Sequence, residues 1–358
     1  MKFLFVSEYY PGEDSNFSGS HLQVYEGAKL CSHFADTHMV AFTRGRPRSL
    51  REGSLKITLL PYSPWEVVRF RRMLTFALKL SPDAVYARGR TYHLAVATAL
   101  KLLKGSAVVW GINAQEGYRY FKYLRDLMNS ERPLWRKVLL VPLFLTIDLT
   151  VAVGMRTADL ITVQNDVQRE RVERKFPGKR VVVVPNIHTP PSIPRGGRGR
   201  YFVWAAANPS PIKRPEVFVK LAEALPDLEF VMVGHIPEAP PPNLTARPRM
   251  RREELLKLLA GARATVITSR SEGVPNLAVE SMLLGTPVVS LGNDFGILRG
   301  VGPVVGDFRE LVESVRKLSE DDILWSDLSR RAEDFARRRF VEEARRAWED
   351  ICGALGRG

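Results

Sequence analysis

The chain has 358 residues, and 45% of them are apolar, which is enough for two domains of ordinary size and excludes an intrinsically disordered protein. Its two cysteines, Cys31 and Cys352, fit neither a disulfide framework nor a zinc motif. They could pair if the two ends of the chain pack together, but we expect free, buried thiols. The six histidines form no metal-ligand pattern, so no metal site is predicted.

The net charge of +14 is concentrated in one part of the chain. Residues 51–200 hold 26 Lys and Arg and 11 Asp and Glu, an excess of +15, while the rest of the chain holds 27 and 28. This asymmetry favours either an anionic partner, such as a phospholipid surface, or a plain solvated basic surface. No nucleic-acid-binding motif is present and the aromatics are not interleaved with the arginines, so nucleic acid is not expected as a partner.

Short apolar runs rich in Val, Ile and aromatic residues predict strands along the first half of the chain. The first run becomes polar too soon for a signal peptide, so a cytoplasmic location is predicted. Helical patterns separate several runs, and this alternation predicts an α/β fold with a doubly wound parallel sheet. The predicted strands are 2–10, 37–43, 55–60, 84–88, 107–112 and 160–164, and the helices include 21–34 and 90–105.

Residues 138–155 form a strongly apolar run with basic residues before and after it. The run is long enough to suggest a membrane span, but Pro142 and Asp148 interrupt it, and a central Asp is costly in lipid. A buried or partly exposed helix is the first expectation, and contact with a membrane surface is the second. Residues 69–80 also combine basic and apolar residues. Together the two segments suggest peripheral contact with an anionic membrane, against the alternative that both are ordinary packing helices.

A second series of alternating strands and helices begins at residue 201. Residues 188–200 are crowded with Pro, Gly and Arg, which is typical of an exposed linker. We therefore predict one domain at 1–187 and a second at 201–335. The pattern of charged and apolar residues in 336–358 predicts a charged amphipathic helix. Its apolar stripe consists of Phe340, Ala344, Ala347, Trp348 and Ile351.

Residues 271–289, SEGVPNLAVESMLLGTPVV, are the most informative stretch. Glu272 follows a predicted strand and Glu280 lies one to two turns into the next predicted helix, at the edge of the sheet where α/β proteins bind ligands. The first N–H groups of that helix suit a diphosphate. These groups are those of Gly273, Val274, Asn276 and Leu277. Carboxylates beside a phosphate-binding helix suit a ligand with hydroxyls and phosphates, such as a sugar nucleotide.

This stretch resembles the E-x7-E motif of retaining glycosyltransferases with the GT-B fold, of the family 4 type, which includes glycogen synthases and bacterial lipid mannosyltransferases. The resemblance implies two Rossmann-like domains that face an interdomain cleft, and a terminal helix, 336–358, that crosses back to the first domain. It places Glu272 near the donor sugar and Glu280 on the ribose hydroxyls. Residues 202–234 resemble the start of a donor domain, in which Lys213 matches a lysine that grips the diphosphate.

The sequence departs from this pattern at several positions. Asn208 stands where the family has an arginine of the diphosphate clamp, and Arg214 is the candidate replacement. Gly19 fits only the second glycine of the family's first glycine loop. Asn113 is the nearest equivalent of a histidine that lies near the donor sugar. Met250 is expected near the base.

The resemblance implies a retaining, metal-independent hexosyltransferase that uses a UDP- or GDP-sugar and no cofactor. Its acceptor would be the hydroxyl of a glycan, of a lipid-linked molecule or of another membrane-proximal molecule, bound by the basic first domain. The expected location is cytoplasmic, with peripheral contact on the inner face of the membrane. The main alternative is a catalytically impaired GT-B-like protein that binds sugar nucleotides, because Asn208 and Asn113 depart from the motif. A sugar-nucleotide epimerase of the same fold and a nucleic-acid-binding protein are weaker alternatives.

Overall fold

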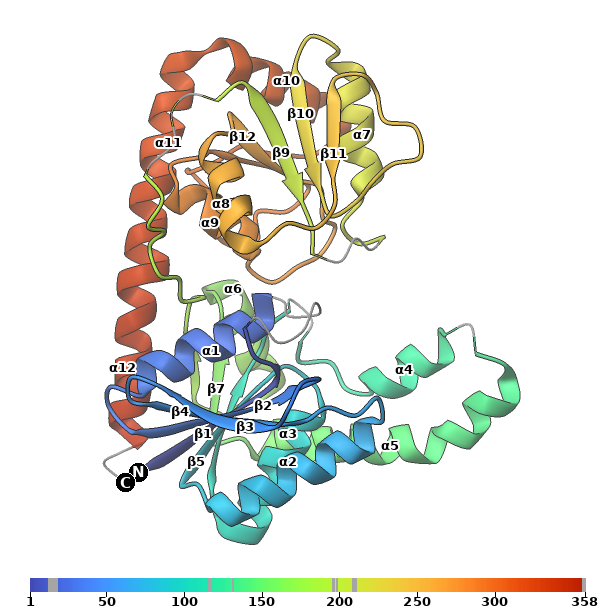
Figure 1. Ribbon diagram of the computed structural model, residues 1–358, viewed down its shortest axis with the longest axis vertical. Helices are drawn as coiled ribbons and strands as arrows, with labels where there is room; N and C mark the ends of the chain where they lie inside the picture. The colour runs from blue at the N-terminus through green and yellow to red at the C-terminus, as the bar shows by residue number, and fades with distance from the viewer. Residues whose placement is uncertain are drawn as a thin grey trace. The chain divides into compact units, whose positions relative to one another are not determined.

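The structure, a computed structural model, describes residues 1–11, 19–114, 117–130, 132–194, 197, 199–207 and 211–355 (Figure 1). The chain divides into two compact units. Unit 1 comprises Met1–Ile187 and Arg345–Gly358, and unit 2 comprises His188–Ala344. Each unit has its own sheet and its own apolar core.

The sheet of unit 1 has the strand order β3-β4-β2-β1-β5-β6-β7-β8. All neighbouring strands are parallel except β3, which pairs antiparallel with β4 at the edge. The central strands are buried on both faces, as expected where helices cover a parallel sheet. The strands are β1 Lys2–Tyr9, β2 Asp36–Thr43, β3 Arg48–Glu52, β4 Leu55–Pro61, β5 Ala84–Arg88, β6 Ala107–Gly111, β7 Leu160–Val163 and β8 Val181–Val183.

The helices of unit 1 connect these strands and pack on them. They are α1 Gly19–Cys31, α2 Glu66–Leu80, α3 Tyr92–Lys104, α4 Lys122–Met128, α5 Leu134–Thr157 and α6 Asp166–Lys175. The side chain of Asn165 caps α6 by accepting a hydrogen bond from the Gln168 N–H at 2.9 Å. Residues from Arg345 onward, in helix α12 (Ala344–Leu355), belong to the same unit.

Helix α5 contains the apolar run of the sequence and Asp148. In Figure 1, α4 and α5 lie together at one side of unit 1. The buried Asp148 carboxylate accepts hydrogen bonds from the Tyr123 N–H at 3.1 Å and the Leu124 N–H at 2.8 Å, so it caps the first turn of α4. Among the described residues, α5 is the helix long and apolar enough to cross a membrane by length and composition, and 22% of its most apolar window is buried.

Helix α12 packs on the sheet of unit 1 through its apolar stripe. The Trp348 ring lies 5.6 Å from the Phe5 ring and 5.1 Å from the Tyr86 ring, measured between centroids. Gly27 of α1 allows this approach, because a Cβ atom there would lie 2.8 Å from the Trp348 ring. In the part of the predicted stripe that lies in α12, Ala344, Trp348 and Ile351 are buried and Ala347 is half-buried, whereas Phe340 precedes this helix and packs in a core cluster of unit 2.

The expectation of free thiols is wrong. Cys31 of α1 and Cys352 of α12 form a disulfide, with their Cα atoms 6.0 Å apart. Both residues are buried, as expected, but the packing of α12 against α1 brings them within bonding distance. The resemblance placed the terminal helix on the first domain, but the sequence did not show that its Cys352 would face Cys31 of α1.

The sheet of unit 2 has the strand order β11-β10-β9-β12-β13-β14, and all of its pairs are parallel. The strands are β9 Tyr201–Ala205, β10 Glu229–Val233, β11 Leu244–Arg247, β12 Ala264–Ile267, β13 Val288–Leu291 and β14 Val304–Val305. The helices are α7 Pro215–Ala224, α8 Arg252–Ala260, α9 Asn276–Leu283, α10 Phe308–Glu320 and α11 Asp322–Ala336, followed by the π-helical turn η1 Arg337–Glu343. The predicted α/β class, with a doubly wound parallel sheet in each half, is confirmed.

Candidate functional site

In unit 2, the first part of the site lies at the carboxyl ends of β9 and β12. These strands are parallel neighbours, so the loops that follow them meet at one edge of the sheet. Lys213 lies in the turn before α7, and Glu272 lies in the loop before α9. The Lys213 Nζ and Glu272 Oε2 atoms are 2.5 Å apart, and both side chains are partly buried. The two residues that the resemblance places at the donor sugar and at the diphosphate, Glu272 and Lys213, are therefore in direct contact.

Arg214 holds the same two loops together. Its Nε donates to the Thr268 carbonyl and its Nη2 donates to the Leu291 carbonyl at 3.1 Å. In return, the Thr268 hydroxyl donates to the Lys213 carbonyl at 2.6 Å. Arg214 also has a left-handed backbone, with φ at 50°. Its guanidinium is thus bonded to the ends of β12 and β13, which is a structural contact that keeps Lys213 in place.

The second carboxylate of the motif, Glu280, lies in the middle of α9 and is buried. Its Oε1 accepts a hydrogen bond from the Arg252 Nε at 2.9 Å, and Arg252 begins helix α8. Burial raises the pKa of the Glu280 carboxyl, and the charge and hydrogen bond of Arg252 act in the opposite direction. Because each helix contributes one charge, the ion pair joins α8 to α9.

A buried histidine adjoins this pair. His188 is 2% exposed, and its backbone N–H donates to the Phe340 carbonyl at 2.9 Å. Burial and the charge of Arg252 lower the pKa of His188 to about 3, against a hydrogen bond with the Asn276 side chain that raises it. The imidazole is therefore neutral at physiological pH, next to the first residue of α9.

The remaining predicted residues of unit 2 surround the start of α9. Gly273 and Val274 lie in the loop before it, and Leu277 is in its first turn. The side chains of Met250 and Leu277 pack against an apolar cluster that includes Leu256, Leu259 and Leu284. Asn208 lies outside the described residues.

In unit 1, the predicted residues Gly19 and Asn113 meet at the carboxyl edge of the other sheet. Gly19 begins α1, and the Asn113 Nδ2, just after β6, donates to the Ser20 Oγ at 3.2 Å. Gly89, with φ at 84°, lies against the Asn113 amide, because a Cβ atom there would be 3.2 Å from Nδ2. Ser20 and Asn113 line a cavity of about 380 Å³, a size usual for small-ligand sites. Its wall includes Glu8, Arg69, Arg88, Lys122 and Tyr123.

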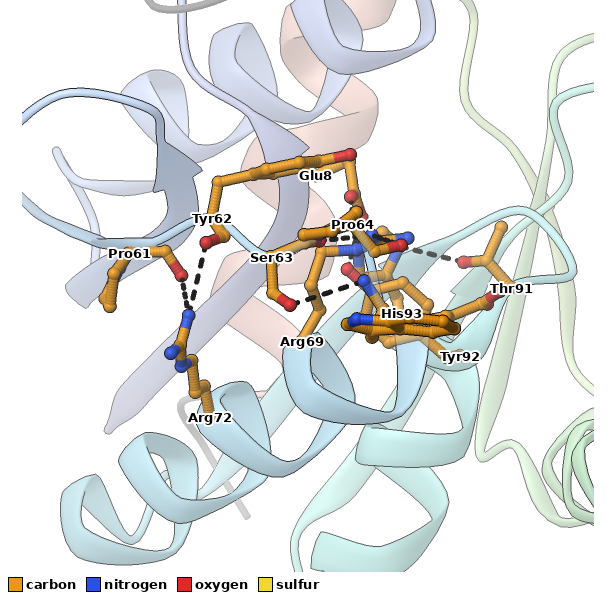
Figure 2. A network of polar contacts seen from close by, with 12 residues as sticks. Glu8, Pro61, Tyr62, Ser63, Pro64, Arg69, Arg72, Thr91, Tyr92 and His93 are labelled. Atoms are coloured by element: carbon orange, nitrogen blue, oxygen red, sulfur yellow. Dashed lines mark hydrogen bonds and ion pairs between the residues drawn. The ribbon is translucent and has the colours of Figure 1, made fainter.

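A network of charges in this wall centres on Glu8, at the end of β1 (Figure 2). Arg69 Nε lies 2.7 Å from Glu8 Oε1, His93 Nε2 lies 3.4 Å from Oε2, and the Tyr92 hydroxyl donates to Oε2. Burial acts to raise the pKa of Glu8, but the hydrogen bonds of His93 and Tyr92 and the charges of His93 and Arg69 outweigh it, so the pKa is lowered. The carboxylate is held ionised in the cavity wall.

Figure 2 also shows how the network is anchored to the loop after β4. Arg69 Nη1 donates to the Ser63 carbonyl at 2.6 Å, and Arg72 Nη1 donates to the Pro61 carbonyl at 2.6 Å. The Thr91 hydroxyl lies 2.8 Å from His93 Nδ1. Both nitrogens of the His93 ring therefore face polar partners, and the ring is fixed in the cavity wall.

Sequence reasoning missed Glu8, Arg69, His188 and Arg252. Glu8 carries a usable signal, because it is a charged residue at the end of an otherwise apolar first strand, where ligand sites form. The other three residues approach their partners only through tertiary packing. The described residues contain no group of three or more His, Cys, Asp or Glu side chains that could hold a metal ion.

Comparisons with known proteins relate one region of the chain to a family model. Residues 200–321 match the family model described as "Glycosyl transferases group 1". No curated protein matches the sequence. Among solved structures, sucrose-phosphate synthase from Thermosynechococcus elongatus is 15% identical, with a TM-score of 0.72, over 99% of this chain and 97% of that one.

Two further structures are similar over nearly their whole length. Trehalose-6-phosphate synthase OtsA is 10% identical, with a TM-score of 0.72, over 99% of both chains. WaaG, a glycosyltransferase involved in lipopolysaccharide biosynthesis, is 12% identical, with a TM-score of 0.68, over 99% of this chain and 100% of that one. At such low identities these likenesses show the fold.

The chain has the two-domain GT-B fold, as the resemblance implied. Its second unit contains a region that matches the glycosyl transferases group 1 model, and this region includes Lys213, Arg252, Glu272 and Glu280. Fold and matched domain together support a GT-B glycosyltransferase.

Proposed function

We propose that the protein is a retaining glycosyltransferase that moves a hexosyl group from a UDP- or GDP-sugar to a hydroxyl acceptor. The observation that carries this proposal is the contact between Lys213 and Glu272 in the region matched by the family model. The contact places the Lys213 ammonium beside the Glu272 carboxylate, which is the group proposed to bind the sugar. Both lie next to the start of α9, where the helix dipole favours anions.

Each residue has a role in the proposed donor site. Glu272 binds the donor sugar, Lys213 stabilises the leaving diphosphate, and Glu280 accepts hydrogen bonds from the ribose. The first N–H groups of α9 and the loop before it add donors for the phosphates; they are those of Gly273, Val274, Asn276 and Leu277. The proposed step is a front-face displacement, in which the departing diphosphate takes the proton of the incoming hydroxyl. No metal ion is included in the proposal.

The acceptor is proposed to bind in the cavity of unit 1, beside Asn113 and the Glu8 network. Carboxylate, guanidinium and imidazole groups in one wall suit the hydroxyls of a glycan or of a lipid-linked or other membrane-proximal acceptor. We place the protein in the cytoplasm, in peripheral contact with an anionic membrane, in keeping with the basic excess of residues 51–200. Nucleic acid is not a proposed partner.

One observation favours a second candidate, a GT-B-like protein that binds a sugar nucleotide without efficient transfer. The family's clamp arginine is replaced by Asn208, and the neighbouring cation Arg214 already binds the backbone at the ends of β12 and β13. Lys213 is then left to stabilise the leaving group together with the helix.

Thermal unfolding in the presence of UDP-, GDP- and ADP-sugars and the free nucleotides, without metal, tests the donor site. A ligand at 100 times its dissociation constant stabilises the fold by about 2.7 kcal/mol, which is readily measured as a rise in Tm. Glu280→Gln should reduce the rise, whereas Glu223→Gln, an exposed position on α7, should not. Binding with turnover supports the transferase, binding without turnover supports the second candidate, and no rise with any nucleotide rejects both.

A further inference from the structure

The surface of helices α4 and α5 is unusually apolar. Ten of the 21 large apolar side chains that are exposed in the described part of the chain fall between residues 121 and 153. They range from 36% to 73% exposed and are Phe121, Met128, Leu134, Trp135, Val138, Leu139, Leu143, Leu145, Leu149 and Val153. Contiguous exposed apolar surface of this kind marks an interaction site.

On α5 these residues form one continuous face. Trp135, Leu139 and Leu143 are four residues apart, as are Leu145, Leu149 and Val153, and these two rows lie next to each other on one side of a helix. At 24 residues the helix is about 36 Å long. The hydroxyls on it are turned inward to the helix backbone, since Thr146 donates to the Pro142 carbonyl and Thr150 to the Thr146 carbonyl, both at 2.8 Å. The face therefore shows few free polar groups.

The opposite face of α5 is fixed to unit 1. Asp148, Val151 and Met155 are buried, and Asp148 caps α4. Gly154 packs tightly on α3, because a Cβ atom there would lie 2.3 Å from the Thr98 hydroxyl. A helix held in this way along its second half cannot cross a bilayer without breaking these contacts, so a membrane contact through α5 is confined to its exposed face.

The charges around this face indicate which kind of surface it would bind. Arg125, Arg132, Arg136 and Arg156 are exposed beside it, and Arg136 stacks 5.0 Å from the Trp135 ring centroid. Residues 117–157 carry seven Lys and Arg against three Asp and Glu, and one of those acids is the buried Asp148. A second copy of the chain would bring like charges together, whereas an anionic bilayer offers both hydrocarbon and opposite charge.

We propose that the α4–α5 hairpin is the docking element of this protein, with the outer face of α5 embedded in the interface of an anionic bilayer. The proposal identifies the surface that makes the membrane contact of the proposed function. It rests on that membrane contact and on no other part of the proposed function. Lys122 and Tyr123, at the start of α4, also line the cavity of unit 1. The hairpin thus connects the proposed docking face to the cavity in which the acceptor is proposed to bind.

Co-sedimentation of the full chain with vesicles tests this inference. The protein should bind vesicles of phosphatidylcholine with about a third phosphatidylglycerol far better than pure phosphatidylcholine, with salt weakening the binding. Val138→Glu combined with Leu139→Glu should lower the affinity about tenfold or more, because both exposed side chains would carry charge into the interface. Ile323→Glu, at an 84% exposed position on α11, is the matched control and should bind like the original chain.

Three results would overturn the inference. They are no binding of the original chain to anionic vesicles, unchanged binding of the Val138→Glu, Leu139→Glu variant with a native Tm, and a dimer in sedimentation velocity that this variant dissolves. Because no sugar nucleotide is present, these outcomes are independent of the donor test. A variant that loses vesicle binding but keeps its Tm rise with nucleotide supports the docking role specifically.

Discussion

At the scale of single residues, the pair of Lys213 and Glu272 shows how the sheet assembles a site. The two residues are 59 positions apart in sequence, yet adjacent parallel strands bring their loops into contact. Both side chains keep some access to solvent. The lysine can therefore exchange its carboxylate partner for a diphosphate, and the carboxylate is then released toward sugar hydroxyls.

Removal of Lys213 tests its proposed role directly. Lys213→Ala should lower kcat by about 10²-fold or more, because a developing diphosphate charge loses its cation in a partly buried site. The measurement is steady-state turnover with the donor identified by thermal unfolding. Lys220→Ala, at an exposed position on α7, is the control and should leave the rate unchanged. Equal rates for both variants would remove Lys213 from the mechanism.

His188 makes unit 2 sensitive to acid. Its pKa is about 3 in the folded chain, mainly because of burial, whereas an exposed histidine has a pKa of about 6.5. Above a pH of about 6.5, His188 is neutral in both the folded and the unfolded chain, so its protonation does not lower the free energy of unfolding. As the pH falls, the unfolded chain binds the proton first, so folding is penalised until the folded pKa is also reached.

The free energy of unfolding should therefore fall as the pH drops from about 6.5 toward 3. His188 contributes about 1.4 kcal/mol per pH unit to this fall. Urea unfolding of the full chain at a series of pH values, followed by tryptophan fluorescence, measures this slope. His188→Gln lacks the titrating group, so its slope should be smaller by that amount. A slope that is the same in both chains would contradict the assignment.

At the scale of elements, strands were predicted best where both faces are buried. The apolar runs of β1, β5 and β12 stand out in the sequence because helices cover both sides of the sheet. Strand β3 was missed because RSLRE is mostly exposed and polar at an antiparallel edge. Helix α6 was missed for a similar reason, since DVQRERVERK offers little apolar periodicity and depends on the Asn165 cap.

The candidate site was predictable only where it follows a local motif. Glu272, Glu280 and the start of α9 lie within one short stretch, so their arrangement follows from strand and helix signals. The partner of Glu280, Arg252, comes from another helix, α8, and its contact with a buried carboxylate depends on the packing of α8 against α9. The exposure of α5 was likewise undecided, because an apolar run does not reveal which of its sides is covered.

At the scale of the whole molecule, the two ends of the chain are tied together. The disulfide between Cys31 and Cys352 closes a sequence separation of 321 residues and fixes α12 beside α1. A cross-link over such a long loop restricts the unfolded chain strongly. Disulfides are rare in proteins that work in a reducing cytosol. The proposed cytoplasmic location therefore implies that this bond is opened unless burial protects it.

Reduction should lower the stability of the folded chain by up to about 6 kcal/mol, the chain-entropy value for a loop of this length. The measurement is Tm with and without reductant, together with thiol counting on the denatured, unreduced protein. Cys31→Ala combined with Cys352→Ala should have the lower Tm without reductant, and reductant should not change it further. Trp348 and Gly27 still hold α12 in this variant, so the helix should remain docked and only the tether is lost. Two free thiols in the unreduced chain, with a Tm unaffected by reductant, would show that α12 is held by packing alone.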